Sequence, residues 1–467
     1  MSESQAPPKS APAVCAAEGC ELRAINRCTR CCGAYYCSQE CQKKAWPAHK
    51  EPCTKAAKIL AQVGSTPTAV DKELKECREM AEAGFPGAQA NLGVLYDHGT
   101  GVAVDHHEAV RWYKLAADGG SLIAQFNLAK CYEDGRGVAM NQLEAVKWYK
   151  LAVTRGCVDS QLNLGVCFAL GKGVARDLHE AFKLFKLAAE AGNLLAMFKL
   201  GYCYEDGDGV DMNKQEAVKW YTLSAEGGHS IAMHFLGECF FNGDGVDVDM
   251  RKAVELFTRS AEAGYSGSQN LLGDCYSSGD GCAVDKRAAF KWYKLAAEQT
   301  DPGPDNSIAQ NSLARCYSEG EGVSKNQSKA VKWWKIAAEK GLKYAQYSLG
   351  VCFAEGDGVP YDMREAIKYY TLAANAGNSD AQTDLAAVYA HGDGVAVDKR
   401  EAFKWYSLAA AKGDEDAQYS LGHFYNDGEG GAPVDKRKAL ALWNQAAENG
   451  SEAAYAILFG LRHGLPI

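Results

Sequence analysis

The residue types best suited to chemistry gather near the start of this chain. Eight potential metal donors lie within residues 15–53: Cys15, Cys20, Cys28, Cys31, Cys37, Cys41, His49 and Cys53. They form four pairs whose members are separated by four, two, three and three residues. Tetrahedral zinc takes four nitrogen or sulfur donors, and a short loop presents two of them at once. The pattern therefore predicts two structural zinc ions, and spacing alone leaves the assignment of pairs to ions open.

Metal binding competes with two other interpretations of these cysteines. Cys32 stands next to Cys31 and is interpreted as a spare thiol, because adjacent cysteines rarely share one ion. A disulfide framework is disfavoured, because residues 1–14 contain no apolar secretory core and the thiols are expected to be reduced or metal-bound. A segment this small buries little surface, so the metal is expected to supply much of its folding free energy.

The remainder of the chain repeats itself at a fixed period. One position recurs every 36 residues, with a single step of 41. Its ten occurrences are Ala88, Ala124, Ser160, Ala196, Ala232, Ser268, Ala309, Ala345, Ala381 and Ala417. A period in this range predicts a solenoid built from one supersecondary unit.

Each repeat unit is predicted to contain two helices. Ala88, Leu92 and Tyr96 form one stripe of a first helix. Asp105 precedes the second helix, and Glu108 follows three residues later, which predicts an N-cap with a capping box in which the glutamate bonds back to the cap N–H. The same pairing recurs at Asn141/Glu144, Asp177/Glu180, Asn213/Glu216, Asp362/Glu365 and Asp398/Glu401. The predicted buried face of the second helix is Ala109, Trp112, Tyr113, Ala116 and Ala117.

This pattern, A…LG..Y..G.GV..D...A..WY..AA..G, resembles the Sel1-like repeat, a relative of the tetratricopeptide repeat. The resemblance covers about residues 85–450. It implies an all-α superhelix of αα-hairpins, with first helices lining a concave face, and a scaffold role. Candidate partner-binding positions on that face are Gln89, Asn91, Gln125, Asn127, Gln161, Asn163, Gln310, Gln346 and Gln382.

The cysteine-rich segment resembles the MYND finger through RCTRC, YYC and the KKAWPAHK…C tail. The resemblance implies a cross-brace in which Cys15, Cys20, Cys37 and Cys41 hold one zinc ion and Cys28, Cys31, His49 and Cys53 hold the other. It also implies binding of short proline-containing peptides.

The chain is expected to divide into a few consecutive parts. These are a disordered tail (1–14), the zinc finger (15–53), a short helix and linker (54–69), an N-terminal capping helix (70–84), the repeats (85–450) and a C-terminal capping helix (451–467). An insertion at 298–307 contains two prolines and is expected to be a surface loop.

A column of cysteines in the first helices is interpreted as packing. Its members are Cys131, Cys167, Cys203, Cys239, Cys275, Cys316 and Cys352. Equivalent positions in stacked repeats lie roughly 10 Å apart, beyond the reach of a disulfide. They are therefore interpreted as small buried hydrophobes.

The charge balance argues against nucleic acid as a partner. Residues 1–58 hold nine Lys/Arg and five Asp/Glu (+4), and the remainder holds 41 and 54 (−13). Seven thiolates and two Zn²⁺ add −3 and reduce the charge of the head to about +1. The Lys–aromatic runs at 147–150, 291–294 and 332–335 are interpreted as solvent-exposed helix faces.

These observations predict a non-enzymatic, zinc-binding adaptor that binds other proteins or peptides. The sequence contains no HExxH, GxSxG or phosphate-cradling glycine motif, and no small-molecule substrate is expected. No run approaches the length of a membrane span, and an intracellular, cytoplasmic or nuclear location is expected. The alternatives are a nucleic-acid-associated regulator that uses the basic finger, and a quality-control adaptor in protein degradation.

Elemental analysis of the purified chain is expected to find two zinc ions, one for each set of four donors. Cys28→Ser or His49→Ala should unfold residues 15–53, because each removes a ligand from a metal-dependent fold. Circular dichroism should show the repeats still helical in both variants. A single global loss of helix would contradict the independence of the two parts.

Overall fold

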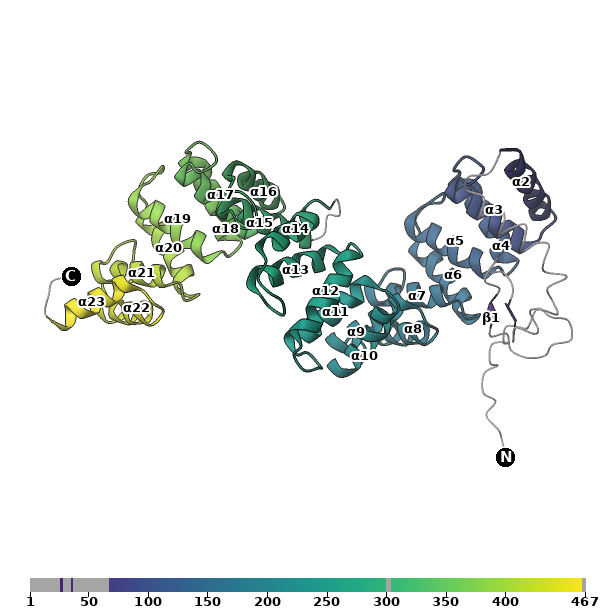
Figure 1. Cartoon of the computed structure of the whole chain (residues 1–467), viewed down its shortest axis with the longest axis horizontal. Coiled ribbons are helices and arrows are strands. Elements are labelled where there is room, and N and C mark those ends of the chain that lie inside the picture. The colour runs from purple at the N-terminus through teal and green to yellow at the C-terminus, as the bar shows by residue number, and fades with distance from the viewer. Residues whose placement is uncertain (1–25, 28–34, 37–66, 300–303, 464–467) are drawn as a thin grey trace, which may run out of the picture. The chain divides into compact units, whose positions relative to one another are not determined.

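A computed structural model describes residues 26–27, 35–36, 67–299 and 304–463, and from residue 67 onward these are helices joined by short loops (Figure 1). The helices alternate as first and second members of antiparallel hairpins, and consecutive helices from α2 to α10 and from α12 to α23 contact one another. The predicted all-α solenoid of hairpins is confirmed.

Ten first helices and ten second helices make up the repeats. The first helices are α3 (Pro86–His98), α5 (Leu122–Asp134), α7 (Val158–Leu170), α9 (Leu194–Asp206), α11 (Ser230–Asn242), α13 (Ser266–Ser278), α15 (Pro304–Glu319), α17 (Lys343–Glu355), α19 (Ser379–His391) and α21 (Glu415–Asp427). The second helices are α4 (His106–Asp118), α6 (Gln142–Thr154), α8 (Leu178–Glu190), α10 (Lys214–Glu226), α12 (Met250–Glu262), α14 (Lys286–Ala297), α16 (Gln327–Glu339), α18 (Met363–Asn375), α20 (Lys399–Ala410) and α22 (Lys436–Glu448).

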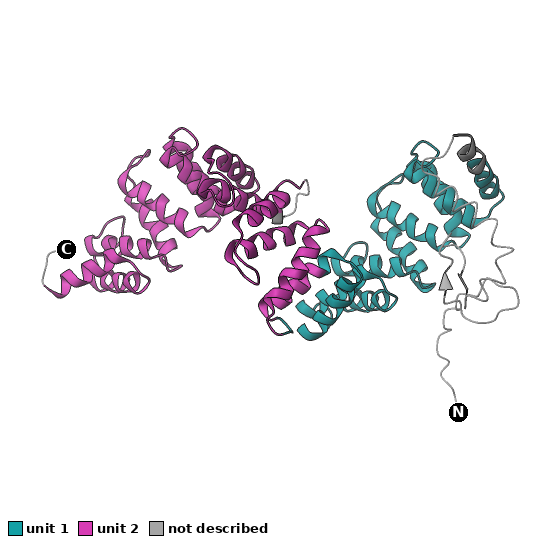
Figure 2. Ribbon diagram, viewed as in Figure 1, with its two compact units in different colours: residues 1–232, 244–246 teal, residues 233–243, 247–467 magenta. Residues whose placement is uncertain are grey.

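The chain divides into two compact units (Figure 2). Unit 1 comprises residues 1–232 and 244–246, and unit 2 comprises 233–243 and 247–467. The fifth first helix, α11, is divided between them at residue 232. Each unit is therefore a stack of several hairpins with its own buried core.

The core of unit 1 shows why a single hairpin cannot fold alone. In the first repeat Leu92 and Tyr113 are fully buried between α3 and α4. The buried cluster around Tyr113 continues into the next repeat through Ala124 and Leu128 of α5. Burying one leucine stabilises the fold by roughly 2 kcal/mol, and each repeat gains part of that burial from its neighbour.

The second helices begin at the predicted N-caps, but only half of the capping box forms. Asp105 Oδ1 accepts from the backbone N–H of Glu108 at 3.0 Å. The expectation that the Glu108 side chain accepts a hydrogen bond from the Asp105 N–H is wrong. The Asp105 N–H donates instead to the carbonyl of Tyr96 at 2.9 Å. Glu108 instead accepts from Arg111 Nη1 at 3.0 Å, one turn further along the helix. The cap N–H therefore ties the second helix to the first.

Successive repeats meet at a glycine in each inter-helix loop. Gly173 has a φ of +69°, and a Cβ there would lie 2.2 Å from the carbonyl oxygen of Gln142, the first residue of the preceding second helix. An L side chain fits neither the backbone conformation nor the space. The repeat spacing thus depends on direct backbone-to-backbone approach.

The ends of the array and the insertion differ slightly from their expected bounds. The N-terminal capping helix is α2 (Pro67–Glu82), which begins three residues before the expected start, and the C-terminal one is α23 (Glu452–Arg462). The expectation that 298–307 is entirely a loop is wrong, because α15 begins at Pro304 and has 16 residues. Proline suits the first turn of a helix, where its missing N–H would have no partner.

Gly173→Ala is expected to destabilise unit 1 by about 3 kcal/mol or more, since it adds backbone strain and an overlap with a carbonyl oxygen. Gly156→Ala is the matched control, because Gly156 also has a positive φ (+79°) but has no neighbour within 4 Å of an added Cβ. The control substitution should lower the free energy of unfolding by about 1–2 kcal/mol, because it adds backbone strain alone. Thermal melts followed by circular dichroism compare the stability of the two variants. Equal losses of stability would contradict the close approach of Gly173 to the carbonyl oxygen of Gln142.

Candidate functional site

The predicted zinc ligands lie outside the described residues. They are Cys15, Cys20, Cys28, Cys31, Cys37, Cys41, His49 and Cys53. Within this segment the structure describes only β1 (Asn26–Arg27) and β2 (Tyr35–Tyr36), which pair antiparallel with Asn26 opposite Tyr36. Seven thiols and one imidazole are a donor set that suits zinc. Among the described residues, no three His, Cys, Asp or Glu side chains are placed to hold a metal ion.

The glutamines predicted as partner-binding positions are structural. Gln346 is 6% exposed, and its Nε2 donates to the carbonyl of Ala338 near the end of the preceding second helix at 3.2 Å. The same bond is made by Gln89, Gln125, Gln310 and Gln382, to Ala81, Ala117, Ala297 and Ala374. For these five residues the prediction of a partner surface is wrong, because a helix's last carbonyls need donors and the buried amide supplies one.

The remaining four predicted positions, Asn91, Asn127, Gln161 and Asn163, are half-buried. Asn163 Nδ2 donates to the carbonyl of Asp159 on its own helix at 2.8 Å. The structure does not bring these four amides together into one site.

The cysteine column is confirmed as packing. All seven members are buried, and none of the described cysteines forms a disulfide. Burial raises the pKa of Cys131 to about 11 and that of Cys203 to about 12. Thiols with such pKa values are poor nucleophiles at neutral pH.

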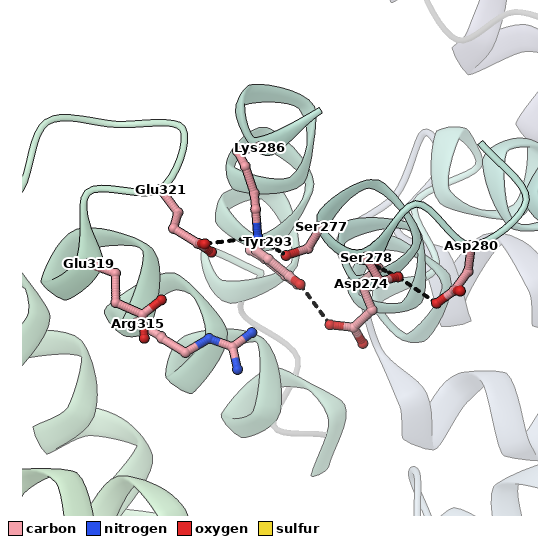
Figure 3. Close-up of a pocket in the computed structure, with 9 residues that line it drawn as sticks. All are labelled: Asp274, Ser277, Ser278, Asp280, Lys286, Tyr293, Arg315, Glu319 and Glu321. Carbon is pink, nitrogen blue, oxygen red and sulfur yellow. Dashed lines mark hydrogen bonds and ion pairs between the residues drawn. The ribbon is translucent and has the colours of Figure 1, made fainter. Parts of the chain in front are cut away.

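A polar cavity of about 550 Å³ lies in unit 2, where the sixth and seventh repeats stack (Figure 3). Its lining residues are Asp274, Ser277, Ser278, Asp280, Lys286, Tyr293, Arg315, Glu319 and Glu321. They come from α13, α14 and α15 and from the loops after the two first helices. The cavity therefore exists only when these two repeats are packed together.

Two paired contacts fix part of the cavity wall. Tyr293 Oη donates to Asp274 Oδ1 at 2.7 Å, and Lys286 Nζ lies 2.8 Å from Glu321 Oε1 (Figure 3). Arg315 is different: among the described residues its guanidinium makes neither a hydrogen bond nor an ion pair. An exposed guanidinium presents five donors in a planar fork that suits a carboxylate.

The cavity environment shifts the pKa of the Asp274 carboxyl group. Burial raises the pKa of Asp274, while the Tyr293 hydrogen bond and the charge of Arg315 oppose that rise. Burial also raises the pKa of Tyr293. The cavity thus places a half-buried carboxylate near an exposed guanidinium, an arrangement that can bind both a donor and an acceptor of one ligand.

A second polar cluster in unit 2 is structural. His234 Nδ1 lies 3.0 Å from Ser268 Oγ, which donates to Ser260 Oγ at 2.7 Å. Ser268 is fully buried, so its hydroxyl cannot reach a substrate. Burial lowers the pKa of His234 to about 4, which keeps the ring neutral at physiological pH. This serine–histidine pair therefore contributes to packing.

Sequence reasoning missed Asp274, Tyr293 and Arg315 as a group. The available signal was a departure from the repeat: the position of Arg315 holds valine in the first, third and eighth copies, at Val94, Val166 and Val351. Asp274 stands in the same column, which also holds Lys130, Glu238 and His423, so its side chain varies between copies and is not set by the repeated packing.

The stacked hairpins and the cysteine-rich segment define a protein that combines a helical repeat array with a small finger. The Sel1 repeat model matches ten consecutive copies between residues 86 and 451, and the MYND finger model matches residues 13–53. The chain belongs to the Sel1 repeat family and carries a MYND finger ahead of its repeats. MYND fingers are zinc-binding domains, and both modules mediate protein interactions.

Similar proteins match the two modules separately. A 46-residue segment is 46% identical to a SET and MYND domain-containing protein of Dictyostelium discoideum, covering 10% of this chain and 8% of that protein. A protective antigen of uropathogenic Escherichia coli with an SLR fold is 33% identical with a TM-score of 0.69, covering 82% of this chain and 80% of that one. A Sel1 repeat protein from Oxalobacter formigenes is 30% identical with a TM-score of 0.53, covering 68% and 90%.

Among the described helices, none combines the length and the apolar character that a bilayer crossing requires.

Gln346→Ala is expected to destabilise unit 2 by about 1–2 kcal/mol, because it leaves a buried helix-end carbonyl without that donor. Gln161→Ala is the control: Gln161 holds the equivalent position in the third repeat and is half-buried, but among the described residues its Nε2 donates no hydrogen bond to the preceding helix. Urea unfolding measures the difference. Equal stability of the two variants would indicate that the glutamine bond contributes nothing.

Proposed function

We propose that this chain is a two-module interaction scaffold, in which the finger binds a short proline-containing peptide and the array holds a second protein. In this proposal the finger contains two zinc ions, one held by Cys15, Cys20, Cys37 and Cys41 and the other by Cys28, Cys31, His49 and Cys53. The zinc ions supply folding free energy, and the peptide contacts come from the polypeptide.

The observation that supports an array partner most strongly is the free guanidinium of Arg315. It lines a cavity that also presents Asp274, a carboxylate on the neighbouring repeat. A peptide segment carries acceptors and donors along one strand and can satisfy both groups. An apolar small molecule would leave the guanidinium of Arg315 without a partner, at a cost of several kcal/mol if it were desolvated.

The compartment in this proposal is the inside of the cell. None of the ten cysteines among the described residues forms a disulfide, and nine of them are buried. Free thiols persist in reducing compartments, whereas secreted chains of this kind form disulfides. Whether the location is the cytoplasm or the nucleus follows from the partners.

Affinity purification with three variants tests the two-module proposal. Cys28→Ser should lose the finger partner and keep the array partner, because it disables only the metal-dependent part. Arg315→Glu should do the reverse, because it replaces the free cation with a like charge for the incoming carboxylate. Arg251→Glu, an exposed charge reversal on α12 in the same unit, should keep both partners.

The proposal fails if every protein captured by the intact chain is also captured by Cys28→Ser. It also fails if Arg315→Glu and Arg251→Glu capture the same proteins in equal amounts.

A further inference from the structure

The outer face of the second helices carries a repeated pair that packing does not require. A lysine or arginine is followed four residues later by an exposed leucine or isoleucine. This pair, the cation–leucine ridge, occurs in eight of the ten repeats: Arg111/Leu115, Lys147/Leu151, Lys183/Leu187, Lys219/Leu223, Lys291/Leu295, Lys332/Ile336, Lys368/Leu372 and Lys404/Leu408. The apolar members are 39–49% exposed.

In six of these repeats a glutamate one turn earlier neutralises the cation. The glutamates are Glu108, Glu144, Glu180, Glu216, Glu365 and Glu401, and their oxygens lie between 2.5 and 3.2 Å from the cationic nitrogen. The same glutamates place a negative charge at the helix N-terminus, where the helix dipole favours it. These six ridges are therefore electrically balanced within their own helix.

The ridges on α14 and α16 lack this glutamate. Ala288 and Lys329 occupy the equivalent positions, and neither helix has an acidic residue in its first turn. The result is a cluster of exposed cations, called here the basic patch: Arg287, Lys291, Lys294, Lys329, Lys332 and Lys335. Leu295 and Ile336 lie among them.

Few contacts within the chain compensate these cations. Lys294 Nζ is 3.8 Å from Glu298, a pair in which both side chains are about half exposed. Lys291 lies over the ring of Trp292 and Lys329 over that of Tyr317, at 5.7 and 5.1 Å. Among the described residues, Arg287, Lys332 and Lys335 have no carboxylate partner. Arg287 and Lys329 lie in the first turns of their helices, where positive charge opposes the helix dipole. The six balanced ridges carry a glutamate in the first turn instead.

We propose that the basic patch is a docking site for an acidic segment of a partner protein that also carries apolar side chains. Carboxylates of the partner would supply the charge that Ala288 and Lys329 do not. Its apolar side chains would cover Leu295 and Ile336. The site goes beyond the proposed function, because it lies on second helices and requires neither the finger nor Arg315.

The arrangement of the helices sets the length of this segment. Helices α14 and α16 both pack against α15 (Figure 1). Axes of packed helices lie roughly 8–10 Å apart, so α14 and α16 are within about 20 Å of each other. A helical segment of about 14 residues spans that distance at 1.5 Å per residue.

The surrounding charge favours an acidic protein segment over nucleic acid. Residues 59–467 hold 41 Lys/Arg and 54 Asp/Glu, a balance of −13, so a long phosphate backbone that leaves the patch would meet repulsion. The exposed apolar pair adds a contact that a phosphate backbone does not use.

Fluorescence anisotropy with the full chain tests the proposal. The probe is a fluorescein-labelled synthetic peptide of Glu, Leu and Ala, about 14 residues long. The double variant Lys291→Glu/Lys332→Glu should weaken binding by about tenfold or more, and binding to the intact chain should weaken as salt is raised. Leu295→Ser/Ile336→Ser should also weaken it.

The matched control is Lys147→Glu/Lys183→Glu, the same charge change on two balanced ridges. It should alter affinity by less than about twofold, since each replaced cation was already neutralised. Arg315→Glu should leave peptide binding unchanged. Equal loss in both lysine pairs, or no saturable binding of the peptide, would overturn the proposal. So would tighter, patch-dependent binding of a single-stranded oligonucleotide of equal charge.

Discussion

Most repeat junctions are set by the approach of a glycine backbone to the start of the preceding second helix. A Cβ on Gly137 or Gly322 would lie 1.9 Å from a backbone carbonyl oxygen, and one on Gly173, Gly209 or Gly281 would lie 2.2 Å away. Hydrogen bonds from buried glutamines to the end of the same helix close the other side of the junction. Because both contacts involve backbone atoms, the spacing between repeats tolerates wide variation in exposed side chains. That freedom allows the surface of the array to acquire binding residues.

Function is accordingly expected where a column departs from the repeat. Arg315 stands in a column that is valine in three other repeats and lines a cavity with Asp274. Ala288 and Lys329 replace a glutamate that balances the outer face of six other second helices. All three departures fall in the sixth and seventh repeats, which belong to unit 2. A residue that repeats in every copy serves stacking, whereas a residue whose type varies between copies is not required by it.

Much of the array could be predicted from sequence, because a period of 36 residues repeats the same local signals ten times. The hairpins, the N-caps at Asp105 and its equivalents, and the buried cysteine column all follow from one copy. The role of Gln346 could not be predicted, because a solvated amide and one that bonds a neighbouring helix have the same sequence periodicity. The use of the Asp105 N–H by Tyr96 and the cavity around Arg315 depend on tertiary contacts that no single helix contains.

The central claim is that stability passes from each repeat to its neighbours through these junctions, while surface residues are free to bind partners. Hydrogen exchange measured by mass spectrometry on the intact chain and on Gly173→Ala tests it most directly. If contacts are limited to neighbours, the substitution should accelerate exchange in α6, α7 and α8, on the two sides of the altered junction, and leave α17 to α22 unchanged. Uniform acceleration from α3 to α22 would contradict the account, because it would show that the array unfolds as one cooperative body.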